Sequence, residues 1–85
     1  MSRARDLVAL IARTLADDPD AVTVTEADRR GTTCVELTSQ SGDLGKLIGR
    51  QGRTAAAVRT LATLAGELEG KRVTVDFLDV PAGDR

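Results

Sequence analysis

The residues best suited to bind a ligand lie in one short segment in the middle of the chain, Gly49-Arg50-Gln51-Gly52. Glycine at both ends lets the backbone turn sharply and lets an anion approach without a Cβ in the way. Arg53 is expected to begin a helix, whose unpaired amides and positive dipole end favour a bound anion. Arg50 and Arg53 add charged donors. These features predict a binding site for phosphate groups.

Three residues just before this segment complete the expected site. Lys46 lies about one helical turn earlier and adds a third cation. Leu47 and Ile48 are expected to line a floor beside the loop, on which bases can rest. Phe77 is the only aromatic residue, which argues against recognition by stacking on aromatic side chains. The predicted site therefore comprises Lys46, Leu47, Ile48, Gly49, Arg50, Gln51, Gly52 and Arg53.

The charge distribution favours this segment although the chain as a whole is slightly acidic. The formal net charge is −1. All charged residues between positions 44 and 66 are basic, namely Lys46, Arg50, Arg53 and Arg59. Residues 17–43 are mainly acidic. A basic segment on an acidic body can direct a polyanion to one face. Arg59 itself is predicted to be a solvated charge on the polar flank of its helix.

The residue types do not support an enzymatic or metal-binding function. The chain has no histidine, which removes the usual zinc ligand sets and imidazole acid–base pairs. Neither glycine-rich nucleotide-binding pattern occurs, and Cys34 has no histidine to activate it. Asp17, Asp18 and Asp20 are interrupted by Pro19, which predicts a helix-ending turn and not a calcium loop. We expect no catalytic residue, metal, cofactor or small-molecule substrate.

The lone Cys34 also bears on localisation. A single thiol cannot form an intrachain disulfide and fits a reducing cytoplasm. The amino-terminal apolar run is broken by Arg13 and is too short for a signal peptide. We therefore expect a cytoplasmic protein without a membrane segment.

Apolar periodicity predicts the elements that position the site. A helix is expected over residues 3–16, with its apolar stripe at Leu7, Leu10, Ile11 and Leu15. Alternating residues predict strands over 22–25 and 33–38, joined into an antiparallel hairpin by a turn at residues 28–31. A helix over residues 43–48, capped by Ser41 and closed by Gly49, is expected next. A longer helix over residues 53–69 has its predicted stripe at Val58, Leu61, Ala65 and Leu68.

A third strand is predicted over residues 73–77, which gives the order α-β-β-α-α-β. The connection between the second and third strands passes through two helices, so a right-handed crossover places these strands parallel. We expect a two-layer α/β (α+β) domain with three helices on one face of a three-stranded mixed sheet. Residues 1–80 form this single domain, and residues 81–85 form a short flexible tail.

The segment Gly45-Lys-Leu-Ile-Gly-Arg-Gln-Gly-Arg-Thr54 resembles the signature of the KH domain. In that family a Gly-x-x-Gly loop clamps about four nucleotides of single-stranded RNA. The additional helix and strand at the amino end resemble the type II KH arrangement. The chain is most similar to the small bacterial single-KH family called KhpA, in its length, in Asp17-Asp-Pro-Asp20 and in Ala57-Val-Arg-Thr-Leu61.

This resemblance implies single-stranded RNA binding in the cytoplasm through residues 48–53. It also implies an RNA chaperone or post-transcriptional regulator linked to cell elongation and wall homeostasis. The implied protein partners are a second copy of the chain or a KhpB-like protein.

A homodimer is also predicted from the residues of the long helix. Its apolar residues span about half the helix circumference, more than a core-facing stripe needs. The excess edge holds Leu61, Leu64 and Leu68, the predicted dimer interface. Four alternatives stay open: a sheet that covers the whole stripe, a protein-docking module with weak RNA binding of its own, single-stranded DNA as the ligand, and a helical corner with merely solvated charges.

Overall fold

The computed structural model describes residues 2–39 and 44–79. Its elements follow the predicted order α-β-β-α-α-β, with short 3₁₀ turns at Pro19–Ala21 and Arg50–Gly52. They are α1 (Arg3–Leu15), β1 (Val22–Arg29), β2 (Thr32–Ser39), α2 (Leu44–Ile48), α3 (Arg53–Leu68) and β3 (Arg72–Asp79). The tail and the Ser41 cap of the predicted fold lie outside the described residues.

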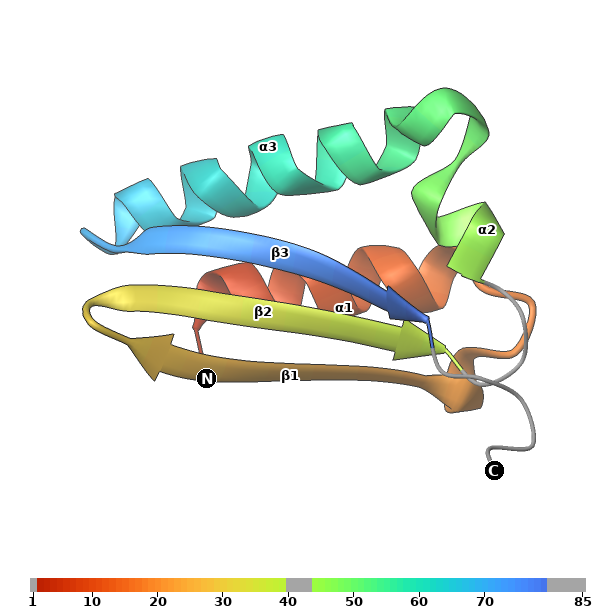
Figure 1. Cartoon of the computed structure of the whole chain (residues 1–85), viewed down its shortest axis with the longest axis horizontal. Coiled ribbons are helices and arrows are strands. Elements are labelled where there is room, and N and C mark those ends of the chain that lie inside the picture. Colours follow the sequence, from red (N-terminus) through yellow and green to blue (C-terminus); the bar gives the residue numbers. More distant parts are fainter. Residues whose placement is uncertain (1, 40–43, 80–85) are drawn as a thin grey trace.

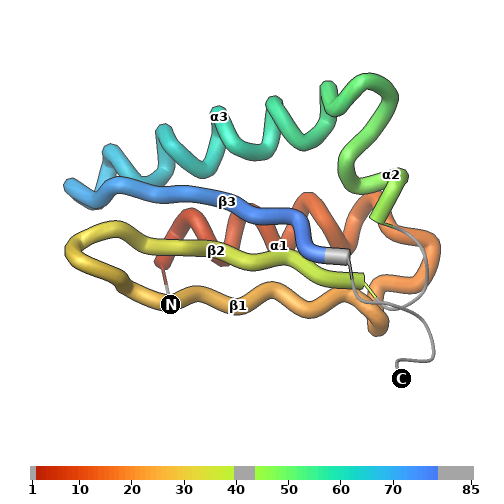
Figure 2. The backbone as a smooth tube through the Cα atoms, in the orientation of Figure 1, coloured from red at the N-terminus to blue at the C-terminus, as the bar shows by residue number. Residues whose placement is uncertain are grey.

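The strands form one mixed sheet, as predicted. Its order is β1-β2-β3, with β1 antiparallel to β2 and β2 parallel to β3. Figures 1 and 2 show α1 passing behind the sheet and α3 running along β3. The helices pack against the sheet face that carries Val24, Val35 and Val75, which are buried in the core. The two-layer architecture is therefore confirmed.

The β1–β2 hairpin is longer and tighter than its sequence indicates. The strands pair from Val22↔Ser39 to Arg29↔Thr32, so the turn contains only Arg30 and Gly31. Both turn residues have positive φ, 53° and 82°. This combination suits the twist of a two-residue hairpin. The prediction of a turn over residues 28–31 was therefore too wide, because strand pairing extends through the charged residues.

The buried face of α1 differs from the predicted leucine stripe. Leu10 is 65% exposed, and the buried positions are Ala4, Val8, Ala9 and Ala12. Small side chains let the helix lie close to the sheet, so alanine makes the contact and leucine remains at the rim. The stripe was wrong at Leu10 and at Leu15, which is 45% exposed, because a leucine-based pattern overlooks an alanine face.

The buried face of α3 shows the same difference. Ala55, Val58, Ala62 and Gly66 are buried, whereas Leu61 and Leu68 of the predicted core stripe are exposed. Gly66 marks the closest approach of α3 to the sheet. A Cβ there would lie 2.4 Å from Val73 Cγ2 and 2.9 Å from the Lys71 carbonyl oxygen.

The amino-terminal end of α1 is fastened to β1 by a buried serine. Ser2 caps the helix by accepting a hydrogen bond from the Arg5 amide at 3.0 Å. Its hydroxyl and amide both donate to Glu26 Oε1, at 2.7 and 3.1 Å. These two donors, the hydroxyl first, lower the pKa of Glu26 below its usual value of 4.5. None of the described helices has the length and apolar character to span a membrane.

Candidate nucleic-acid interface

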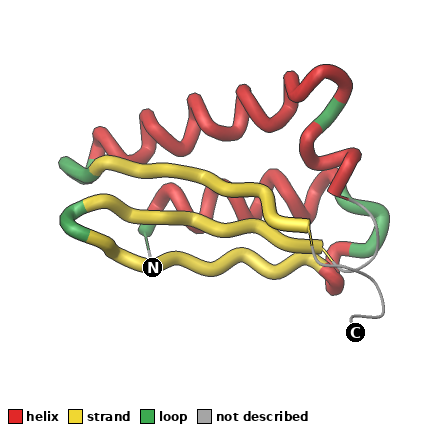
Figure 3. Tube along the Cα trace, in the orientation of Figure 1, coloured by secondary structure: helices red, strands yellow, loops and turns green. Residues whose placement is uncertain are grey.

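The Gly49–Gly52 segment forms a tight loop between α2 and α3, at one end of the molecule (Figures 1 and 3). Gly49 ends α2 by donating its amide to the Gly45 carbonyl at 2.9 Å. Three of the four loop residues have positive φ: Gly49 at 82°, Gln51 at 57° and Gly52 at 72°. The predicted glycine-hinged loop is thus present, and it directs the chain straight into α3.

The two loop glycines meet different surroundings. A Cβ on Gly49 would lie 2.4 Å from Thr54 Oγ1 and 2.8 Å from Thr54 Cβ. Gly49 also has ψ 169°, in a region of backbone conformation open almost only to glycine. A Cβ on Gly52 would meet nothing within 4 Å. Gly49 is therefore required by the fold, whereas the Cα of Gly52 faces open space.

The first turn of α3 begins beside this open space. Gly52 is the N-cap and, having no side chain, leaves the first-turn amides without a side-chain cap. That turn carries no acidic residue. Arg50 and Arg53 are exposed, and Arg53 Nη2 donates to Gln51 Oε1 at 3.1 Å. The open space at Gly52 thus adjoins the first turn of α3 and lies between two exposed arginines in the sequence, a composition suited to an anion.

Lys46 is held close to the loop by an acidic residue. Its ammonium group forms an ion pair with Asp17, and both side chains are largely exposed. The pair joins α2 to the segment that follows α1. In the described part of the chain, no group of acidic or cysteine side chains gathers closely enough to hold a metal ion.

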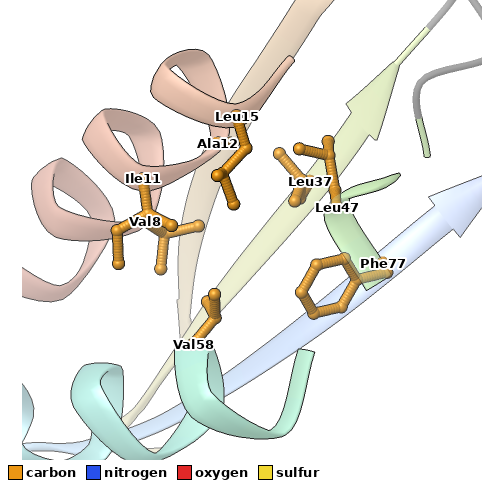
Figure 4. Close-up of a pocket in the computed structure, with 8 residues that line it drawn as sticks. All are labelled: Val8, Ile11, Ala12, Leu15, Leu37, Leu47, Val58 and Phe77. Carbon is orange, nitrogen blue, oxygen red and sulfur yellow. The ribbon is translucent and has the colours of Figure 1, made fainter. Parts of the chain in front are cut away.

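Leu47 requires a correction, because its side chain is only 2% exposed and belongs to the core. It faces Leu37, Val58 and Phe77 around a void of about 10 Å³, shown in Figure 4. Its place on the inner side of a one-and-a-half-turn helix leaves no surface for a base. Leu47 therefore anchors α2, which leads into the loop, to the core. Of the two residues predicted to form an aliphatic floor, only the half-buried Ile48 has surface to offer a base.

Arg59 makes contacts with β3 that the sequence reasoning missed. Its Nε donates to the Val75 carbonyl oxygen at 3.1 Å, and its guanidinium carbon lies 5.2 Å from the Phe77 ring centroid. It thus crosses from α3 to the free edge of β3 instead of being a merely solvated charge. A shallow concavity of about 300 Å³ adjoins it, lined by Arg59, Thr63, Val73, Thr74 and Val75. The available signal was Gly66 on the same flank, which marks the close approach of the two elements.

The predicted dimer residues form an exposed leucine row on α3. Leu61, Leu64 and Leu68 are 44%, 52% and 77% exposed. We call these three residues the α3 patch. Their spacing places them on one flank of the helix, away from the Gly66 flank that contacts β3. The α3 patch is separate from the loop, so a partner bound at the patch leaves the loop accessible.

The fold and the loop together define a KH domain of type II. The chain belongs to the KhpA/KhpB KH-domain family, whose model matches residues 5–77. One relative is "RNA-binding protein KhpA" of Aquifex aeolicus, 44% identical over 93% of this chain and 100% of that protein. Another is "RNA-binding protein KhpA" of Caldanaerobacter subterraneus, 45% identical over 86% and 97%. The family is not an enzymatic one, as the sequence predicted.

A solved structure shares the fold at low sequence identity. It is the crystal structure of Era in complex with MgGDPNP and nucleotides 1506–1542 of 16S ribosomal RNA. The TM-score is 0.65 at 18% identity, over 94% of this chain and 31% of that chain. At this identity the match supports the fold alone.

Proposed function

We propose that this protein binds single-stranded RNA, with the sugar–phosphate backbone held at the Gly49–Gly52 loop. The observation that carries the proposal is the open space at Gly52, at the start of α3, where no side chain caps the helix and the flanking Arg50 and Arg53 are exposed. A phosphodiester is the anion that such a loop holds in KH domains, about four nucleotides at a time. The names of the relatives, RNA-binding protein KhpA, support the same ligand class.

The test is a double substitution, Arg50→Asp with Gln51→Asp. Both side chains are exposed, so the variant should fold normally while two carboxylates repel the RNA backbone. A matched control, Arg13→Asp with Thr14→Asp on the exposed side of α1, changes the net charge equally. Fluorescence anisotropy should show loss of RNA binding only in the loop variant. Unchanged RNA affinity with a native circular dichroism spectrum would refute the proposal.

The salt dependence tests the size of the contact. With two or three phosphates neutralised by the loop, a four-nucleotide RNA should give a slope of log K against log salt of about −1.5 to −2. A slope near −6 on this short RNA contradicts a contact confined to the loop. Single-stranded DNA of the same sequence serves as the competitor that decides between the two nucleic acids.

A second function is favoured by the α3 patch, and we propose that it forms a dimer interface. Three leucines exposed on one helix flank are suited to pairing with a second copy or with a KhpB-like protein. Light scattering at micromolar concentration should give a molar mass above the 9.0 kDa of one chain. Leu64→Lys should shift it toward monomer without unfolding, whereas Thr23→Lys, at an exposed position on β1 away from α3, should not. A monomeric wild-type protein refutes the homodimer.

The resemblance extends the proposal to the cell. We place RNA binding in the cytoplasm, in keeping with the free thiol of Cys34. There the protein would act as an RNA chaperone or post-transcriptional regulator that affects cell elongation and wall homeostasis. Complementation of a deletion strain tests this role. Wild-type protein should restore cell length, and the loop variant should not.

A further inference from the structure

The outer strands of the sheet offer backbone groups to which another strand can pair. The order β1-β2-β3 leaves β1 and β3 at the two edges of the sheet (Figure 1). The 8 residues of β1 pair one-to-one with β2, so β1 contains no bulge that would bend its edge away. A straight edge strand of this length is a template for a strand from another chain. The β1 edge is therefore a surface suited to strand pairing.

The register shows which backbone groups of β1 face outward. Arg29 and Thr32 flank the two-residue turn and form its hydrogen-bonded pair, so the odd-numbered residues of β1 bond to β2. The amides and carbonyls of the even-numbered residues point away from β2. Val24 belongs to this outward-facing row, near the middle of the strand. A strand added to β1 would therefore bond to the Val24 carbonyl oxygen.

An arginine from the first helix already binds that carbonyl. Arg5 of α1 donates from Nη2 to the Val24 carbonyl oxygen at 3.3 Å. Its Nη1 donates to Asp6 at 3.3 Å, which helps to hold the guanidinium in place. The Arg5 side chain is only 22% exposed, so it lies against the edge of the sheet. A strand that pairs with β1 must first displace this guanidinium.

The same contact occurs at the other edge of the sheet. Arg59 of α3 donates from Nε to the Val75 carbonyl oxygen of β3 at 3.1 Å. Arg5 directly follows the buried Ala4, and Arg59 directly follows the buried Val58. Both arginines thus lie at the flank of the buried helix face. Each helix therefore supplies one arginine to the carbonyl of an outer strand.

Inward-pointing acids on β1 limit the ways in which two copies of this strand can pair. Glu26 accepts from the Ser2 hydroxyl at 2.7 Å, and Asp28 accepts from the Thr33 hydroxyl at 3.0 Å. Antiparallel registers that place these carboxylates opposite one another are destabilised by like charges. The registers that avoid this repulsion are centred near Val24 and Thr25. They need the carbonyl that Arg5 binds.

We propose that the β1 edge is a strand-pairing surface for a second copy of this chain, and that Arg5 keeps it closed. Release of Arg5 from Val24 lets two β1 strands pair antiparallel and join two sheets into one. A second copy fits this edge because a register centred on Thr25 places threonine opposite threonine, a favourable cross-strand pair. The inference depends neither on RNA binding nor on the α3 patch.

The test is Arg5→Met, made in the Leu64→Lys chain so that the α3 patch does not contribute. Methionine suits a helix but cannot donate to Val24. Without RNA, light scattering at high micromolar concentration should give at least twice the molar mass of Leu64→Lys alone. Infrared spectra should gain the amide band of intermolecular β-sheet, and circular dichroism should remain native. Arg13→Met, an equal charge change at an exposed position of α1, should alter none of these. Equal masses for the two variants overturn the inference.

A second substitution tests where the copies meet. Thr25→Lys added to Arg5→Met should restore the lower mass, because two lysines then face each other across the paired strands. Thr38→Lys, on the same face of the central strand β2, should not. If Thr25→Lys fails to reverse assembly, or Thr38→Lys reverses it equally, the copies meet elsewhere and the inference is overturned. Arg5→Gln, whose shorter side chain keeps the helix surface polar, replaces Arg5→Met if that variant unfolds, and the same results are expected.

Discussion

The two loop glycines should respond differently to the same substitution, alanine. At Gly49 the backbone conformation is nearly exclusive to glycine, which costs about 1–3 kcal/mol for alanine. The added Cβ also overlaps Thr54 at 2.4–2.8 Å, and such overpacking costs about 1–3 kcal/mol more. At Gly52 only the left-handed conformation is penalised, by about 1–2 kcal/mol, since the space is open. Gly49→Ala should therefore be the more destabilising by about 2 kcal/mol.

Thermal unfolding followed by circular dichroism measures this difference. For a domain of this size about 1 kcal/mol shifts Tm by roughly 4–8 °C, so Gly52→Ala, at about 1–2 kcal/mol, should lower Tm by roughly 4–16 °C. Gly49→Ala, which costs about 2 kcal/mol more, should lower Tm by roughly a further 8–16 °C. Gly70→Ala is the matched control for Gly52→Ala, since Gly70 has φ 69° and open space but ends α3 far from the loop.

Binding separates the roles of the glycines further. Gly52→Ala should weaken a four-nucleotide RNA about 10-fold or more, because its Cβ occupies the space where the phosphodiester is expected. Gly70→Ala should lose stability equally and leave that affinity unchanged. If Gly52→Ala binds as wild type, no phosphate approaches this Cα and the site is misplaced. If Gly49→Ala is as stable as Gly52→Ala, the argument from Thr54 is wrong.

Three further substitutions test the fold. Gly66→Ala should lower the free energy of unfolding by about 1–2 kcal/mol, because the added Cβ meets the Lys71 carbonyl oxygen. This cost outweighs the better helix propensity of alanine, and urea unfolding measures it. Arg30→Asn should stabilise by about 1 kcal/mol in the same assay by relieving positive φ. Glu26→Gln should destabilise most above pH 4.5, and the difference from wild type should shrink as pH falls below that value. The lowered pKa of Glu26 makes its stabilisation complete above the unfolded value, and acid removes it as pH falls through the folded value. A pH-independent difference from wild type contradicts this linkage.

The sequence was sufficient for the order of elements and for the sheet, because alternation and glycine positions are local signals. It was insufficient for the buried helix faces. Leucine dominates any apolar pattern, yet α1 and α3 approach the sheet through Ala12, Ala62 and Gly66. Which face lies closest depends on the distance between layers, a property of the whole fold. Exposed Leu10 and Leu68 were therefore assigned to the wrong side.

The candidate site was predictable where it depends on backbone conformation. Gly49 and Gly52 make the expected sharp turn, both with positive φ, and Arg50 and Arg53 are exposed beside them. Side-chain direction was less predictable. Leu47 points into the core because α2 is short and has only one side to bury. Arg59 depends on the free edge of β3, which no pattern within α3 can indicate.

The residues that shape the loop are different from the residues exposed on it, and this explains how a slightly acidic chain could bind a polyanion. The shape of the loop depends on neutral contacts, Gly49 against Thr54 and Leu47 in the core. Its exposed side carries only basic and neutral groups. Lys46, three residues before the loop, forms an ion pair with Asp17 and so offsets that charge. Since charges beyond about 10 Å are largely screened at 0.1 M salt, distant carboxylates weaken binding little. Local arrangement therefore matters more than net charge for the proposed binding at the loop.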